Sequence, residues 1–146
     1  MERQQLNRIL KAHLKYLNGE EGGVRASLSG ERLQNAKLAG VNLKGALIRR
    51  ANLEWADFSG ADLSGADLRY ANLLAVNFTD ANLRGADLRN ACLCGAMMDG
   101  ADLTGANLKG ADLCLYHIDE IFIDGAIMPD GKLYDHQIHR LATFVE

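Results

Sequence analysis

The chain has 146 residues, of which 48% are apolar, and a net charge of −3. This length suits one domain with a hydrophobic core, and so mild a charge is typical neither of a nucleic-acid binder nor of a strongly acidic protein. The sequence lacks an apolar run of about 18 residues, so neither a transmembrane helix nor a membrane partner is expected. Three cysteines, in a sequence that starts without the pattern of an export signal, predict reduced thiols and a cytoplasmic location.

The first predicted element is an amphipathic helix over residues 3–17, followed by a linker that ends at residue 25. Its apolar stripe follows helical spacing and consists of Leu6, Ile9, Leu10, His13, Leu14 and Leu17. Asn18-Gly19 is a typical helix stop. Because so short a helix is marginal alone, we expect residues 1–25 to cap the element that follows, with His13 as a packed cap residue.

A five-residue repeat occupies residues 26–115 and continues more weakly to residue 128. Leucine fills the centre of the unit fourteen times between Leu28 and Leu113, and alanine stands two residues earlier fifteen times between Ala26 and Ala111. In an extended segment these two residues face one side, and the Asp or Asn between them faces the other. The remaining two residues, often ending in Gly, suit a corner. We therefore predict a β-solenoid over residues 26–128, with coils about 4.8 Å apart.

Several residues recur every 20 positions rather than every 15, which favours four units in each coil. Two aromatic centres, Phe58 and Phe78, are 20 residues apart, and Gly recurs by 20 at the corner. Basic residues that follow the centre show the same spacing: Arg49, Arg69, Arg89 and Lys109. A four-sided coil of this length gives about five coils in the solenoid.

The repeat units resemble a known sequence family. Stretches such as "ANLEW", "ADLSG", "ADLRY" and "ANLRG" are similar to the A(D/N)LXX motif of pentapeptide repeat proteins. The resemblance covers about residues 26–128, and it implies an all-β solenoid, the right-handed quadrilateral β-helix. It implies little about activity, because most of that family has no assigned activity.

Residues 129–146 are predicted to form a second cap. Pro129-Asp130-Gly131 is a turn signal. The stripe after it favours a short C-terminal helix and consists of Tyr134, Ile138, Leu141 and Val145. Leu133 also stands in the repeat register, so a last strand is the competing interpretation.

Carboxylates and histidines raise the question of catalysis or metal binding. Asn fills the outward position of the repeat as often as Asp and cannot act as a general base, so we interpret both as scaffold residues that bond the backbone. The aspartates in this position are Asp57, Asp62, Asp67, Asp87, Asp102 and Asp112. His136 and His139 stand three apart, but no clear fourth ligand accompanies them. We predict no catalytic residue, no metal site and no cofactor.

The three cysteines fall on one face of the predicted solenoid. Cys92 and Cys94 flank the inward Leu93 and therefore point outward, and Cys114 stands one coil above Cys94. Stacked thiols can support redox chemistry or bind a soft metal. We favour the simpler interpretation of small packed side chains, because no cation in this position would lower a thiol pKa.

Two faces are candidate interaction surfaces. The basic face suits an anionic partner or simple solvation, and it carries Arg49, Arg50, Arg69, Arg89 and Lys109. Like charges stacked in register repel, and we expect aspartates on the same face to relieve part of that. The apolar face suits docking of another protein or a second copy, or cover by a terminal segment, and it carries Trp55, Leu74, Ala75, Cys94, Cys114 and Leu115.

The function predicted from these features is that of a non-enzymatic protein-interaction or scaffold module that uses flat β-helix faces. The sequence lacks phosphate-loop, nucleophile-elbow and dinucleotide motifs, and a rod with a filled core offers no natural substrate cavity. The family resemblance supplies the alternative, a DNA-mimicking inhibitor of DNA gyrase or topoisomerase, from which the basic face and the two predicted caps depart. Direct nucleic-acid binding is not expected, because Tyr70 is the only aromatic residue near the basic side chains.

Overall fold

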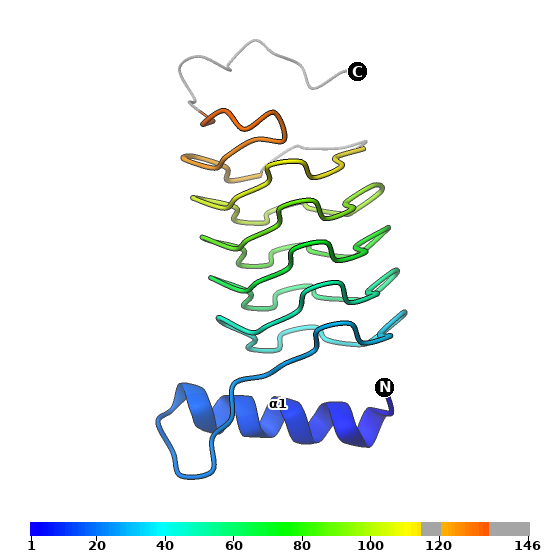
Figure 1. Ribbon diagram of the computed structural model, residues 1–146, viewed down its shortest axis with the longest axis vertical. Coiled ribbons are helices and arrows are strands. Elements are labelled where there is room, and N and C mark those ends of the chain that lie inside the picture. Colours follow the sequence, from blue (N-terminus) through cyan, green and yellow to red (C-terminus); the bar gives the residue numbers. More distant parts are fainter. Residues whose placement is uncertain (115–120, 135–146) are drawn as a thin grey trace.

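The computed structural model describes residues 1–114 and 121–134. These residues form one helix and, above it, a stack of four-sided coils that Figure 1 shows with its long axis vertical. Several residues of the sequence predictions lie outside the described ranges: Leu115, His136, Ile138, His139, Leu141 and Val145.

The helix α1, Arg3–Leu17, has the bounds that the sequence predicts and lies across the end of the stack (Figure 1). Leu6 and His13 are buried, and Ile9 and Leu10 pack against the core of the coils. Leu14, by contrast, is half exposed. The predicted apolar stripe is therefore confirmed for its core-facing members and wrong for Leu14.

Two glycines bring the chain from α1 back to the first coil. Gly19 follows the helix at a φ of 67°, where a residue with a side chain would be strained. Gly23 passes so close to α1 that an added Cβ would stand 2.4 Å from the backbone nitrogen of Tyr16. The backbone N–H of Val24 donates to Ala12 at 3.0 Å, so the linker is fixed against the helix.

His13 joins α1 to the open edge of the first coil. Its Nδ1 accepts a hydrogen bond from the backbone N–H of Ala26 at 3.0 Å, and its Nε2 donates to the carbonyl of Lys44 at 3.1 Å. In later units the equivalent N–H donates within its own coil, as Glu31 does to Leu28, and the equivalent carbonyl accepts from the coil below, as Arg49 does from Gly30. His13 supplies both partners at the first coil. This arrangement requires the neutral imidazole, and burial is the main cause of the lowered pKa of His13. The prediction that His13 is a packed residue is confirmed.

The coils repeat every 20 residues, as the sequence spacing predicts. Parallel bridges, each one residue long, join outward positions 20 apart, from Ser27–Leu47 to Asn107–Ile127. In each unit the central N–H donates to the coil above, as Leu68 does to Asp87 at 2.8 Å. Four units of five residues therefore complete one coil, and residues 20 apart stack on one face.

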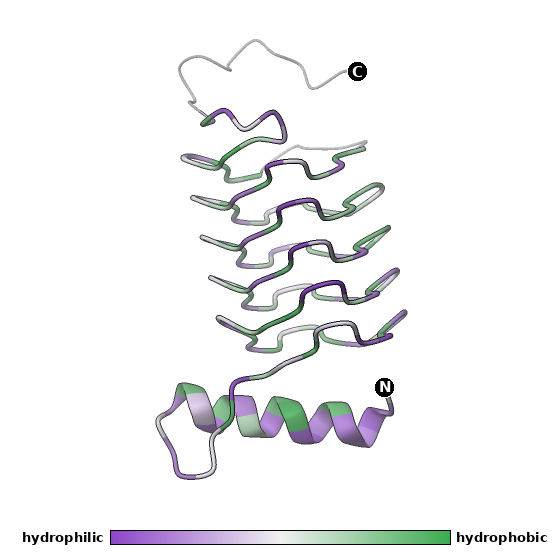
Figure 2. Ribbon diagram, in the orientation of Figure 1, coloured by the Kyte–Doolittle hydropathy of each residue, from purple (hydrophilic) through white to green (hydrophobic). Residues whose placement is uncertain are grey.

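The core is a column of small and large aliphatic side chains. The Ala and Leu of each repeat are buried almost everywhere between Ala26 and Leu108, and Figure 2 shows apolar and polar residues alternating along each coil. Phe58 and Phe78 stack with ring centroids 5.6 Å apart on one side of this column. Each buried leucine contributes about 2 kcal/mol of hydrophobic stabilisation, so the repeat itself holds the rod together.

Each corner of the coil needs a residue with positive φ. Glycine fills most corners, but side chains occupy several in spite of the strain of about 1 kcal/mol or more that a left-handed residue carries. These corners are Asn35, Arg50, Trp55, Tyr70, Ala75, Asp80 and Asn90, all with φ between 52° and 60°.

The described C-terminal part ends in a hairpin. The turn at Pro129-Asp130-Gly131 is confirmed, with the N–H of Gly131 donating to Met128 at 2.8 Å. Leu133 then pairs antiparallel with Ile127, and the N–H of Tyr134 donates to Ala126 at 2.7 Å. Leu133 therefore does not continue the parallel coil, and Tyr134 lies in the hairpin rather than on the predicted helix. The competing prediction of a last strand is therefore confirmed at Leu133, although the pairing is antiparallel, and the remaining residues of the predicted helix lie outside the described ranges.

Candidate functional site

The basic face is a ladder in which guanidinium and carboxylate groups alternate. Arg69 binds Asp67 of its own coil through two nitrogens, both at 2.9 Å, and its Nε lies 3.5 Å from Asp87 of the next coil. Arg49 pairs with Asp67 from below, and Arg89 binds Asp87 at 2.6 and 2.8 Å. The prediction that aspartates relieve part of the repulsion is confirmed, because each of these arginines is paired with Asp67 or Asp87. The face therefore offers less free positive charge than the sequence indicates.

Asp67 is the most enclosed carboxylate of this ladder, with 9% of its surface exposed. The bonds from Arg69, and then those from Arg49, hold the pKa of Asp67 far below its ordinary value of 3.8, although burial acts in the opposite direction. The pKa of Asp87 is also lowered, chiefly by Arg89. The ladder is thus ionised at neutral pH and serves the fold as a structural element.

The remaining basic residues stand beside the ladder. Arg50 lies over the ring of Tyr70, 5.6 Å from its centroid, and both residues occupy strained corners. Together with Arg49, Arg69 and the Ser29-Gly30 pair they line a surface hollow of about 420 Å³. Lys109 follows Asn107, which offers an amide where the lower coils have a carboxylate.

The apolar face forms a continuous column at one corner of the coils. The N–H of Trp55 donates to Leu74 at 3.0 Å, and the N–H of Ala75 donates to Cys94 at 2.9 Å, so these residues are direct neighbours on consecutive coils. Trp55 is 61% exposed, Cys114 is exposed, and the others are half buried. The described members of the predicted face are therefore brought together.

Sequence analysis missed other exposed apolar side chains. Met97 and Phe122 occupy outward positions, where the repeat usually has Asp or Asn, and they are 51% and 62% exposed. Leu133, in the hairpin, is also exposed. The departure from Asp or Asn at the outward position was the signal that would have identified Met97 and Phe122.

The outward Asp and Asn residues have the scaffold role that the repeat predicts, with one exception. From Asn42 to Asn107, the side chain of each accepts a hydrogen bond from the backbone N–H two residues later, as Asp62 does from Ser64 at 2.9 Å. Asp112 differs, because its Oδ1 accepts from the thiol of Cys114 at 3.2 Å and the structure gives it no bond from that residue's backbone. The scaffold interpretation is therefore confirmed for five of the six predicted aspartates and wrong for Asp112.

The cysteines lie beside this exceptional aspartate. All three have free thiols, and Cys92 pairs with Asp112 in the parallel bridge between consecutive coils. The thiol of Cys94 contacts that of Cys114, and this contact is the main cause of its raised pKa. A raised pKa keeps Cys94 protonated at neutral pH, which is unlike a reactive cysteine nucleophile.

In the part of the chain that the structure describes, the one helix is too short and too polar to cross a membrane.

Comparison with known proteins agrees with the repeat. A family model for pentapeptide repeats matches residues 26–65, 61–98 and 82–115. A trypsin-treated form of QnrB1, a plasmid-mediated fluoroquinolone resistance protein, is 21% identical over 81% of this chain and 69% of its own, with a TM-score of 0.55. No match was found among curated proteins.

Two further solved structures are more similar in sequence. A pentapeptide repeat protein of the Arabidopsis thaliana thylakoid lumen is 31% identical over 79% of this chain and 73% of its own, with a TM-score of 0.44. HetL, involved in heterocyst differentiation regulation in the cyanobacterium Nostoc, is 32% identical over 76% of this chain, with a TM-score of 0.42. This chain spans 63% of HetL, less than two thirds of its length. The chain belongs to the pentapeptide repeat family.

Proposed function

We propose that this protein is a non-enzymatic interaction module that docks a partner protein on the apolar face, with Trp55 as the anchor. The observation that carries the proposal is the state of Trp55, which combines 61% exposure with a φ of 60°. An exposed Trp contributes little to folding, and glycine at this corner would remove the strain. Tryptophan is also among the residues most enriched at the energetic centres of protein interfaces. A residue that costs stability without packing in the free protein is best explained by a contact made on binding.

The sides of the rod are better suited to docking than its N-terminal end. α1 takes up the edge groups of the first coil, because His13 bonds both Ala26 and Lys44, and the N-terminal amine donates to the carbonyl of Arg32 at 3.1 Å. Edge groups that are already bonded cannot pair with another chain. We therefore assign α1 the role of a cap, and we retain the right-handed winding and the roughly five coils expected from the family.

The test compares Trp55→Gly with Asn35→Gly. Asn35 stands at the same corner one coil below, with a φ of 58°, and is therefore a matched control for the strain. Trp55→Gly should raise the free energy of unfolding by about 1 kcal/mol, because strain is removed and no packing is lost. The same variant should lose the partner that the wild type and Asn35→Gly capture from the native cell.

Two outcomes would overturn the proposal. One is a partner that binds Trp55→Gly as well as the wild type. The other is a loss of stability in Trp55→Gly, which would mean that Trp55 packs against the protein's own chain. Sedimentation velocity of the purified protein measures the alternative occupant, a second copy, since a dimer through this face should dissociate in Trp55→Gly.

A further inference from the structure

We propose that Cys92, Cys94, Asp112 and Cys114 form a binding site for one zinc ion on the outside of the β-helix. The site shares Cys94 and Cys114 with the apolar face but does not include the anchor Trp55, and it does not depend on the proposed docking function. Its ligands come from two consecutive coils, so a bound ion would link them.

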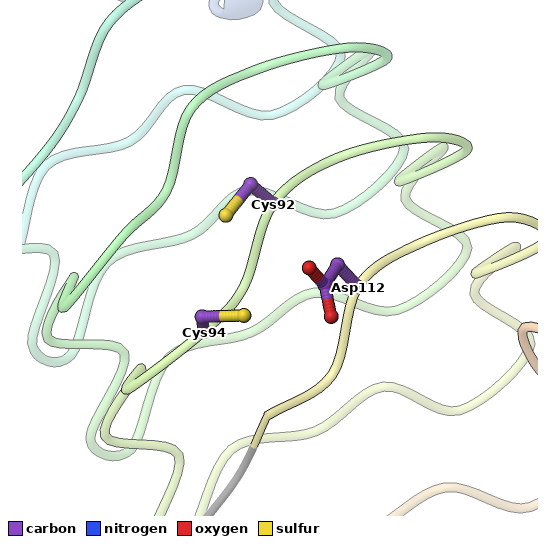
Figure 3. A group of neighbouring side chains, drawn as sticks. All are labelled: Cys92, Cys94 and Asp112. Atoms are coloured by element: carbon purple, nitrogen blue, oxygen red, sulfur yellow. The ribbon is translucent and has the colours of Figure 1, made fainter.

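The candidate ligand atoms lie close together. Figure 3 shows Cys92 and Cys94 on one coil and Asp112 on the next, with both sulfur atoms and the carboxylate gathered in one small region. The Sγ atoms and a carboxylate oxygen all lie within 4.8 Å of one another. Tetrahedral zinc with Zn–S bonds of about 2.3 Å places its ligands about 3.8 Å apart. Small side-chain rotations would therefore close the site without a change in the backbone.

A fourth ligand stands beside these three. The Cys114 Sγ lies 3.2 Å from Asp112 Oδ1. Cys114 lies outside the group whose ligand atoms are all within 4.8 Å of one another, so its side chain must rotate toward the ion to complete a tetrahedral set of three sulfurs and one oxygen. Zinc accepts such a set because its filled d shell imposes no other geometry. Soft thiolates also select zinc over magnesium or calcium, which prefer oxygen.

Asp112 lacks the side-chain hydrogen bond to the backbone that the other outward Asp and Asn residues have. Every outward Asp or Asn from Asn42 to Asn107 is tied to the backbone N–H two residues later, whereas Asp112 faces the Cys114 thiol instead. Among the described residues, no ion pair involves Asp112. Its carboxylate is therefore free of the scaffold role and available as a ligand.

The basic face offers a comparison at the same backbone positions. There the guanidinium of Arg69 lies between Asp67 of its own coil and Asp87 of the next, at 2.9 and 3.5 Å. The equivalent positions on the apolar face hold Cys94, Cys92 and Asp112. On the basic face, the guanidinium of Arg69 is thus a cation between the outward residues of two coils. On the apolar face, Cys94 stands in the position of Arg69, so no side chain that the structure describes supplies a cation between Cys92 and Asp112. A metal ion takes the place of the guanidinium.

Binding exchanges protons for the metal. Zinc is bound by thiolates, so the three thiol protons pass to solvent as the Zn–S bonds form, and no oxidation takes place. The chain has three cysteines in all, and each belongs to the site. Any thiol measurement on this protein therefore reports on the site alone.

The experiment is a thiol titration of the reduced wild-type protein with a chromogenic disulfide, without and with one equivalent of zinc. All three thiols should react to completion in the free protein and be protected together after zinc is added. Cobalt as a substitute should give the absorption of a tetrahedral, thiolate-bound ion. Asp112→Asn and Cys92→Ser should each weaken zinc binding at least about tenfold, since even the loss of an outer-shell partner weakens metal binding by that factor.

Asp62→Asn is the matched control, because Asp62 has the same repeat position on another face and should leave zinc affinity unchanged. Circular dichroism of each variant checks that the coils are intact. Thiol reactivity that one equivalent of zinc leaves unchanged would overturn the proposal, and this result needs no variant. Equal zinc affinity in the wild type and Cys92→Ser would overturn it as well.

Discussion

The basic face and the apolar face use the same backbone positions to opposite effect. On the basic face, the outward Asp67 and the Arg69 that follows the centre neutralise each other, and Arg69 also reaches the next coil. On the apolar face, the outward Cys92 is followed by Cys94, and the next coil presents Asp112. The comparison teaches that the β-helix supplies a fixed frame of ligand positions. The side chains at these positions determine whether they bind one another, as Asp67 and Arg69 do, or remain available to a bound ion.

The first prediction compares the removal of equivalent carboxylates. Asp67→Ala should lower the free energy of unfolding by about 2 kcal/mol, because two guanidinium groups lose charge-assisted hydrogen bonds and the turn loses its side-chain bond. Asp112→Ala should lower it by about 0.5 kcal/mol or less in metal-free protein. Urea unfolding of both variants measures the difference. Equal losses of unfolding free energy would mean that Asp112 stabilises the folded protein as much as Asp67 does, which would contradict the difference between the two faces.

The second prediction concerns the loss of the Asp67 and Asp87 ion pairs at low pH. The pKa values of Asp67 and Asp87 are lower in the folded protein than their ordinary value of 3.8. Their contribution to stability is therefore fully present above that pH and is lost as the pH falls toward the lowered folded values. Urea unfolding at neutral pH should separate the wild type from Asp67→Asn, and the gap should narrow near pH 3. A gap independent of pH would contradict the ladder.

The third prediction converts one face into the other. Cys94→Arg places a guanidinium where Arg84 stands relative to Asp102, a pair 3.0 Å apart on the opposite face. The new side chain should pair with Asp112, abolish zinc binding and change the free energy of unfolding by less than about 1 kcal/mol, as expected for an exposed pair. Isothermal titration with zinc measures the loss. Zinc affinity that is unchanged in Cys94→Arg would show that zinc does not bind between Cys94 and Asp112.

The smallest expected effect concerns DNA gyrase. The charges on the basic face are largely paired but not negative in sum, which is unlike a surface that imitates DNA. We therefore expect no inhibition of gyrase supercoiling by the purified protein at micromolar concentrations. Inhibition would establish the alternative function that the family resemblance raises.

The coil could be predicted in detail because each repeat states its own geometry. A pair of one small and one large inner residue recurs every five positions, and basic residues recur every 20. These two spacings determine which residues share a face, as the bridges confirm. The hairpin at Leu133 could not be predicted, because its register matches both a continued coil and a reversal. The turn at Pro129-Asp130-Gly131, rather than the pattern of apolar residues, determines that Leu133 pairs antiparallel with Ile127.

The sites were predictable as positions but not as chemistry. The sequence indicates that Cys92 and Cys94 point outward, yet it does not reveal that Asp112 leaves its usual backbone bond for the Cys114 thiol. That departure depends on side-chain rotation, which a five-residue pattern does not encode. For the same reason, the strain at Trp55 appears only when its φ of 60° is known.

The most direct test of the shared frame is anomalous diffraction at the zinc edge, from crystals grown with one equivalent of zinc. We predict one strong peak bounded by the sulfur atoms of Cys92 and Cys94 and a carboxylate oxygen of Asp112, at the place that a guanidinium occupies on the basic face. A peak elsewhere on the molecule, or none at this position, would contradict the account.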